Sequence, residues 1–262
     1  MPSRTLDPED AAMLLFDQGY AVFERAFDPA QVHSLRQEVE DLYLSLGSPP
    51  CYADDLRILG PAVHVGKPGL IVAKLVERRP SLGGRILDES VVDTMRRLLG
   101  DDMYLELTAT VIADETREFF AWHNHIGGQD DGAYRATGAW PDIARPRRIG
   151  TLLYLDELDD DNGPLLVYPR AAGAPTAPPH DLDGEDWAGQ VVVRAPAGSV
   201  VAMDECVWHA ARRKRTRGLR ILIGCNFVSR TAPRAPLVEY SLRSNAYADD
   251  LLRSVLPPEE VR

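Results

Sequence analysis

The sequence predicts an α+β protein with a mainly β core, in which N-terminal helices pack on one sheet of a β-sandwich or jelly roll. Three observations lead to this prediction. Capped helical patterns occupy the first third of the chain, and short β-branched segments separated by Gly, Pro and Asp follow from Met103 onward. In addition, 45% of the 262 residues are hydrophobic, which is enough for a large core. Helices first and strands afterwards are typical of this class.

Two helices are expected near the N-terminus, each with its own start and stop signals. Asp7 is placed to cap the first helix, Pro8 stands at its first position and Gly19 ends it, and residues 20–24 follow as a short strand. Asp28-Pro29 repeats the start signal, and Gln31 completes a capping box. The apolar face of this second helix consists of Val32, Leu35, Val39, Leu42 and Leu46.

A third helix is expected over residues 89–99, with Val92, Met95 and Leu99 facing inward. Seven strands follow from composition and spacing: 103–112, 118–123, 148–156, 164–169, 190–195, 199–204 and 219–229. We expect the Pro- and Gly-rich stretch 171–189 to be a long loop over the mouth of a site. The prediction is one domain, 1–262, with a helical part (1–102), a jelly-roll core (103–230) and a C-terminal extension (231–262).

Charge and composition exclude several classes of partner. The chain has 29 basic and 40 acidic side chains, a formal charge of −11, which argues against nucleic acid and anionic membrane surfaces. No apolar run is long enough to cross a bilayer, and the N-terminus lacks a signal pattern. Three widely spaced Cys imply no disulfide framework and favour a reducing cytoplasm. We expect a small-molecule substrate, while the oligomeric state cannot be derived.

Two segments could carry chemistry. In Trp122-His123-Asn124-His125, residues i and i+2 of a strand point to the same face, so His123 and His125 could reach one metal ion. The alternative is two polar residues at a strand edge. In the second segment a strand leads to His209, and Arg220 opens the next apolar strand eleven residues later. A buried guanidinium requires an anion.

Together these residues match the layout of a non-haem iron site with two His ligands and a carboxylate clamp. Imidazoles hold Fe(II), open coordination positions remain, and an Arg fixes the remote carboxylate of a 2-oxo acid that chelates the metal.

At this point the chain resembles the phytanoyl-CoA dioxygenase family of Fe(II)/2-oxoglutarate oxygenases. Four segments carry the resemblance in the family's order: LFDQGYAVFERAFDPAQVHSLRQEVEDLY, WHNH, IGTLLYLDELDDDNGPLLVYPRAAG and GSVVAMDECVWHAARRKRTRGLR. The resemblance implies a double-stranded β-helix core and His123 and His209 as iron ligands. It also implies Arg220 as partner of the 2-oxoglutarate C5 carboxylate, with Thr151 as a second co-substrate-binding candidate.

The chain departs from the family at the carboxylate ligand, where His125 stands. Three solutions remain open. His125 completes a three-His face; Asp130 swings in through the Gly127-Gly128 loop; or the position is vacant, as in halogenases where chloride replaces the carboxylate. Trp122 before His123 favours the three-His solution.

The sequence therefore predicts an oxygenase using Fe(II), 2-oxoglutarate and O₂ on a small molecule, such as a carbohydrate or natural-product intermediate. Hydroxylation or oxidative cyclisation would release succinate and CO₂. The rival functions are a three-His dioxygenase without 2-oxoglutarate, a halogenase-like enzyme, and an inactive family member acting as a binding module.

Overall fold

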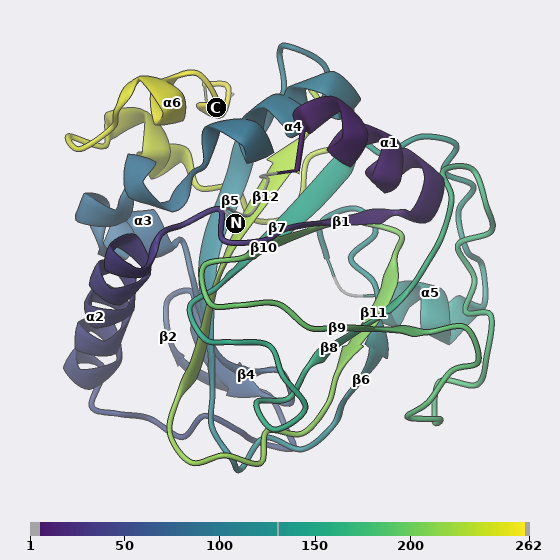
Figure 1. The fold of residues 1–262 in the computed structure, drawn as a ribbon, viewed down its shortest axis with the longest axis horizontal. Coiled ribbons are helices and arrows are strands. Elements are labelled where there is room, and N and C mark those ends of the chain that lie inside the picture. The colour runs from purple at the N-terminus through teal and green to yellow at the C-terminus, as the bar shows by residue number, and fades with distance from the viewer. Residues whose placement is uncertain (1–5, 130, 260–262) are drawn as a thin grey trace, which may run out of the picture.

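The computed structural model describes residues 6–129 and 131–259. Within these residues, twelve strands form two antiparallel sheets, one of eight and one of four strands (Figure 1). The larger sheet has the order β1 (Tyr20–Phe23), β10 (Val200–Asp204), β7 (Arg148–Tyr154), β12 (Arg220–Val228), β5 (Tyr104–Ala113), β4 (Gly69–Ala73), β3 (Val63–Gly66), β2 (Arg57–Gly60). The smaller sheet has the order β6 (Phe120–His123), β11 (Trp208–Ala211), β8 (Leu165–Tyr168), β9 (Val191–Val193).

The three predicted helices are confirmed as α1 (Pro8–Gln18), α2 (Pro29–Ser45) and α4 (Glu89–Leu99). Asp7 caps α1, and Asp28 with Gln31 forms the expected capping box of α2. Shorter helices also occur: α3 (Leu75–Arg78), α5 (Gly132–Thr137), α6 (Asp250–Arg253), η1 (Pro80–Leu82), η2 (Gly84–Ile86) and η3 (Tyr240–Ser244). In the part of the chain that is described, no helix is long and apolar enough to span a membrane.

The larger sheet buries both of its faces. On β12, Ile221 and Ile223 pack with the helices in one core, whereas Leu222 packs between the two sheets. This alternation follows from the period of two along a strand. The space between the sheets is filled by residues from both, including Tyr154, Leu165, Val167, Val201 and Met203. Two facing sheets with helices on one of them make the predicted jelly roll.

The seven predicted strands are confirmed, but the first third of the chain is less helical than expected. β2, β3 and β4 form a meander over residues 57–73 that extends the larger sheet. Its outermost strand is mostly exposed, so no alternating apolar pattern marked it. A further strand that was not predicted separately is β11, which carries His209.

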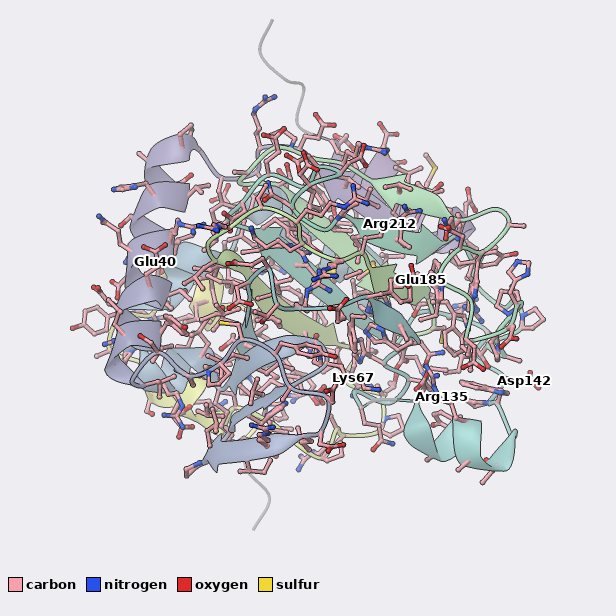
Figure 2. The ribbon with its side chains drawn as sticks, turned by 90° about the horizontal axis from the view of Figure 1, so that it is seen from below. Glu40, Lys67, Arg135, Asp142, Glu185 and Arg212 are labelled. Atoms are coloured by element: carbon pink, nitrogen blue, oxygen red, sulfur yellow. The ribbon has the colours of Figure 1, made fainter. Side chains whose placement is uncertain are left out.

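The Pro- and Gly-rich stretch 171–189 is a long loop, but it lies on the outer face of the smaller sheet. Its Trp187 stacks on Trp122 with ring centroids 4.2 Å apart and planes 9° from parallel. Trp122 also donates a hydrogen bond to the carbonyl of Glu185 in this loop. Figure 2 shows Glu185 far from Glu40 of α2, on the side of the molecule away from that helix. The prediction that this loop lies over the mouth of a site is therefore wrong: the loop covers the aromatic outer face of the smaller sheet.

Candidate metal centre and nearby buried arginines

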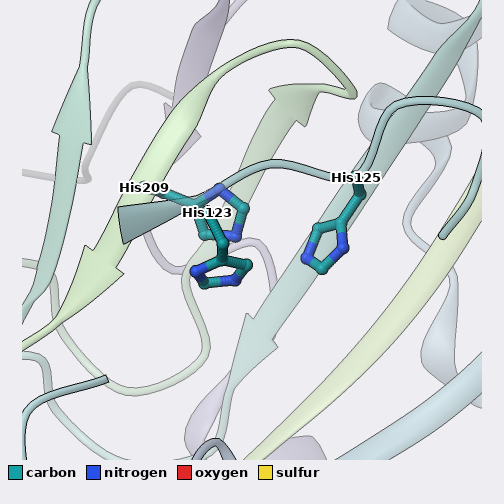
Figure 3. Close-up of side chains that lie close together, drawn as sticks. All are labelled: His123, His125 and His209. Atoms are coloured by element: carbon teal, nitrogen blue, oxygen red, sulfur yellow. The ribbon is translucent and has the colours of Figure 1, made fainter. Parts of the chain in front are cut away.

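Three histidines come together where the smaller sheet meets the turn after β6. His123 on β6 and His209 on β11 are direct cross-strand partners, with ring centroids 4.1 Å apart. Their neighbours Trp122 and Trp208 pack in the aromatic cluster on the outer face, so the two imidazoles occupy the opposite, inner face. His125 follows in the turn, and Figure 3 shows its ring directed toward the other two.

The geometry of this group suits one metal ion. One ligand atom from each of the three histidines lies within 4.8 Å of those from the other two. The centroid of His125 is 5.0 Å from that of His123 and 5.1 Å from that of His209. Three nitrogens at this spacing can occupy one face of an ion and leave its remaining positions open.

Local hydrogen bonds orient two of these imidazoles. Nδ1 of His123 lies 2.9 Å from the carbonyl of Ala121, and Nδ1 of His209 lies 3.0 Å from that of Val207. With Nδ1 donating, Nε2 keeps its lone pair for a metal. Burial, followed by the charge of nearby histidines, lowers the pKa of His209 to about 3 and that of His123 well below its usual value. Both rings are therefore neutral at physiological pH.

The third histidine is held by the main chain. His125 is exposed, and its backbone N–H donates to the carbonyl of Glu205 at 3.0 Å. The rival ligand Asp130 lies outside the described residues. The structure thus brings together His123, His125 and His209, the three residues that the sequence assigned to the metal.

Arg220 opens β12, as expected, and is buried between the sheets. The residue is 5% exposed, and its guanidinium carbon lies 5.2 Å from the ring centroid of Tyr154. Its Nε is buried and has no hydrogen-bond partner, and no carboxylate of the described residues pairs with it. A buried guanidinium in this state calls for an anionic ligand.

A second buried arginine, Arg117, was missed by the sequence reasoning. It is 1% exposed, and it donates to the carbonyls of Ala211 at 3.3 Å and Arg212 at 2.5 Å, just beyond His209 on the chain. Burial, and then the charge of Arg220, lowers the pKa of Arg117 to about 9. Arg117 therefore lies beside the end of the strand that carries His209 and close enough to Arg220 to feel its charge. A lone Arg in a loop of mixed charge gives no signal for this role.

Thr151 is placed elsewhere. It lies on β7, and its hydroxyl donates to the carbonyl of Cys225 at 3.1 Å. Its neighbours along this face, Ile149 and Leu153, belong to the core under the helices. The structure therefore places Thr151 on the helix-facing side of the larger sheet, whereas Arg220 lies on its opposite side, toward the smaller sheet.

The model of the family described as phytanoyl-CoA dioxygenase (PhyH) matches residues 16–222. The chain belongs to the phytanoyl-CoA dioxygenase family. This confirms the resemblance seen in the four sequence segments and makes the protein an enzyme, an oxygenase that depends on Fe(II) and 2-oxoglutarate. No curated protein matches the sequence significantly.

Solved structures share the fold over most of the chain. SnoK, described as a non-heme alpha ketoglutarate dependent carbocyclase from nogalamycin biosynthesis, is 17% identical, with a TM-score of 0.65 over 99% of this chain and 98% of that chain. EctD from S. alaskensis, solved with 2-oxoglutarate and 5-hydroxyectoine, is 19% identical, with a TM-score of 0.63 over 87% and 80%. HygX from Streptomyces hygroscopicus, with nickel and 2-oxoglutarate bound, is 15% identical, with a TM-score of 0.57 over 86% and 88%.

The residues present fit the iron and the 2-oxoglutarate of this family. The clustered imidazoles of His123, His125 and His209 are suitable donors for Fe(II). The buried guanidinium of Arg220, without a carboxylate partner among the described residues, suits the distal carboxylate of 2-oxoglutarate. One difference from the family pattern remains: His125 stands where that pattern has a carboxylate.

Proposed function

We propose that His123, His125 and His209 hold Fe(II) through three nitrogens, and that Arg220 binds the C5 carboxylate of 2-oxoglutarate. The observation that carries this proposal is the approach of all three ligand atoms to within 4.8 Å. A vacant third position, as the halogenase-like alternative requires, fits less well with a ring of His125 directed into the cluster (Figure 3). A dioxygenase without 2-oxoglutarate would leave Arg220 without a role.

The protein's own residues set the electrostatics of this centre. Neutral imidazoles leave a ferrous ion with its full double positive charge, one unit more than a set containing a carboxylate. The proposal places the second positive end of the co-substrate site at Arg220, with the charge of the buried Arg117 near it. A dianion such as 2-oxoglutarate, with one carboxylate for each end, matches this distribution. When bound, iron and 2-oxoglutarate supply the activation of O₂ that oxidises the substrate and yields succinate and CO₂.

The substrate that we propose is a small neutral or cationic molecule, such as a carbohydrate or another natural-product intermediate. The formal charge of −11 favours such substrates over the acyl-CoA of the family name. The similarity to SnoK, a carbocyclase of nogalamycin biosynthesis, supports cyclisation beside hydroxylation as an outcome.

An anaerobic Fe(II) titration followed by a succinate assay tests the proposal. We expect one Fe(II) per chain, and succinate formation that requires iron, 2-oxoglutarate and O₂ together. In His209→Ala both iron binding and succinate formation should be lost. Iron binding without any 2-oxoglutarate turnover would support the inactive binding module, and stoichiometric iron in His209→Ala would contradict the ligand set.

A further inference from the structure

A buried carboxylate, Glu205, lies directly behind the turn that carries His125. Glu205 stands between β10 and β11, and its side chain is 1% exposed. Its carbonyl accepts the N–H of His125 at 3.0 Å, and Oε2 of its carboxylate accepts the N–H of Gly127 at 2.7 Å. The residue thus holds the turn at two points, one at the proposed ligand and one two residues beyond it.

Glu205 is itself fixed by a buried ion network. Nη1 of Arg148 donates to Oε2 of Glu205 at 3.2 Å, and Nε of Arg148 donates to Glu106 at 2.8 Å. The N–H of Glu205 donates to the carbonyl of Arg148 at 3.0 Å. Burial alone would lower the pKa of Arg148, but the carboxylates of Glu106 and Glu205 outweigh it and raise that pKa. With Arg147 Nε 3.8 Å from Oε1 of Glu205, two acids face two bases, and the network is neutral.

The turn is also packed against this network. Gly127 and Gly128 adopt φ values of +76° and +73°, which glycine reaches without strain. A Cβ on Gly128 would lie 3.0 Å from Nε of Arg148 and 2.7 Å from the Cβ of Ala235. The backbone at Gly128 is therefore packed closely against the guanidinium of Arg148, with no room for a side chain.

We infer that Glu205 is a positioning residue that holds His125 at the metal, with Arg148 and Glu106 as its support. The inference rests on the proposed function, because it takes His125 as a ligand. The physical reason is the difference between the ligands. His123 and His209 are fixed by paired strands, whereas His125 is an exposed residue of the turn after β6, outside those pairs. Glu205 does not lie within the cluster of ligand atoms, so it acts through the turn.

Two variants distinguish the hydrogen bond between Glu205 and Gly127 from the negative charge of Glu205. Glu205→Ala removes the acceptor for Gly127, while Glu205→Gln keeps the shape and one acceptor but removes the charge. Loss of a residue that orients a metal ligand typically weakens metal binding by about 10–100-fold. We expect that range for Co(II) bound to Glu205→Ala, measured by titration, and a smaller loss in Glu205→Gln. The matched control is Asp204→Asn, which changes the adjacent buried carboxylate. Asp204 pairs with Arg170, and among the described residues it makes no hydrogen bond or ion pair with the turn.

Two further readouts identify the route of the effect. In the metal-free protein, the amide of Gly127 should exchange hydrogen faster in Glu205→Ala than in the wild type and in Asp204→Asn. In a His125→Ala background, Glu205→Ala should cause no additional loss of Co(II) affinity, because the ligand that it positions is absent.

The same variants distinguish the failure of each proposal. If His125→Ala alone leaves Co(II) affinity unchanged, His125 is not a ligand and the proposed three-His set is wrong. If His125→Ala weakens Co(II) binding but Glu205→Ala does not, the positioning role alone is overturned. An equal loss from Glu205→Ala with and without His125 would also overturn it, since the effect would then be general destabilisation.

Discussion

The protein buries arginines in two different ways. Arg148 is closed off by its own acids, with Glu106 and Glu205 both in contact with its guanidinium. Arg220 and Arg117 are as deeply buried, but no carboxylate of the described residues pairs with either, and the Nε of each lacks a hydrogen-bond partner. The closed cluster, Arg148 with Glu106 and Glu205, has its counter-charges without a ligand, and we infer above that it holds the turn of His125. Arg220 and Arg117 form the open cluster, which gains a counter-charge only when an anion binds.

The largest difference between the two clusters is expected when Arg148 and Arg220 are each replaced by alanine. Arg148→Ala leaves two buried carboxylates without their main partner, so it should lower the free energy of unfolding by about 3–5 kcal/mol. Arg220→Ala removes a buried charge that has no acid of its own, so without co-substrate it should stay within about 1 kcal/mol of the wild type or be more stable. Urea denaturation of the metal-free proteins measures the free energy of unfolding of both variants. Equal destabilisation would show that the clusters do not differ.

Arg117 tests whether the open cluster acts as one unit. At an effective dielectric constant of 20, a charge at about 10 Å from a carboxylate contributes about 1.7 kcal/mol, or roughly 15-fold in affinity. Arg117→Met should weaken 2-oxoglutarate binding by about this factor in calorimetry, and Arg117→Lys should weaken it less because the charge is kept. A loss that is the same for Met and Lys would assign Arg117 to the support of Ala211 and Arg212 alone.

The two glycines that follow His125, Gly127 and Gly128, test whether contact with Arg148 of the closed cluster sets the turn. Both have positive φ, so an alanine at either position costs about 1–2 kcal/mol in backbone strain. They differ in surroundings: a Cβ at Gly128 meets Arg148 and Ala235, whereas a Cβ at Gly127 meets only Gln129 at 3.9 Å. Gly128→Ala should therefore weaken Co(II) binding more than Gly127→Ala. Equal Co(II) affinities would mean that contact with Arg148 does not set the turn.

The smallest effect is expected from restoring the family's ligand. His125→Asp recreates the carboxylate at the third position, and it should keep or improve Fe(II) affinity because it lowers the charge at the ion. Asp130→Ala should leave that affinity unchanged. If Asp130→Ala instead removes the metal while His125→Ala retains it, the loop after His125 supplies the ligand.

Local signals decided which parts of the fold could be predicted. The caps at Asp7 and Asp28 lie next to the helices they start, so α1 and α2 could be located from the sequence. The meander β2–β4 could not, because its edge strand is exposed and its stability comes from pairing with β5, about forty residues further along the chain. The Pro- and Gly-rich composition of 171–189, with strands resuming after it, predicts a loop at the site. Its actual place depends on the stacking of Trp187 on Trp122, which leaves no local sign in the sequence.

In the site, too, residues with local sequence signals could be predicted, and residues that depend on distant partners could not. The spacing of His123 and His125, and the apolar strand after Arg220, are local patterns that marked chemistry. Arg117 and Glu205 were missed because their partners come from distant positions: the carbonyls of Ala211 and Arg212 for one, the turn after β6 for the other. Thr151 lies on the helix-facing side of β7, which depends on how that strand is registered in the sheet.

The most direct test of the open cluster compares 2-oxoglutarate with 2-oxopentanoate, which has the same 2-oxo acid group and chain length but no distal carboxylate. Succinate or butyrate formation by the iron-loaded enzyme gives kcat/KM for each. In the wild type we expect a preference for 2-oxoglutarate of about 100-fold or more, since a lost buried ion pair costs about 3 kcal/mol or more. Arg220→Ala should abolish most of that preference while iron still binds. An undiminished preference for 2-oxoglutarate in Arg220→Ala would contradict the assignment of Arg220 to the distal carboxylate of 2-oxoglutarate.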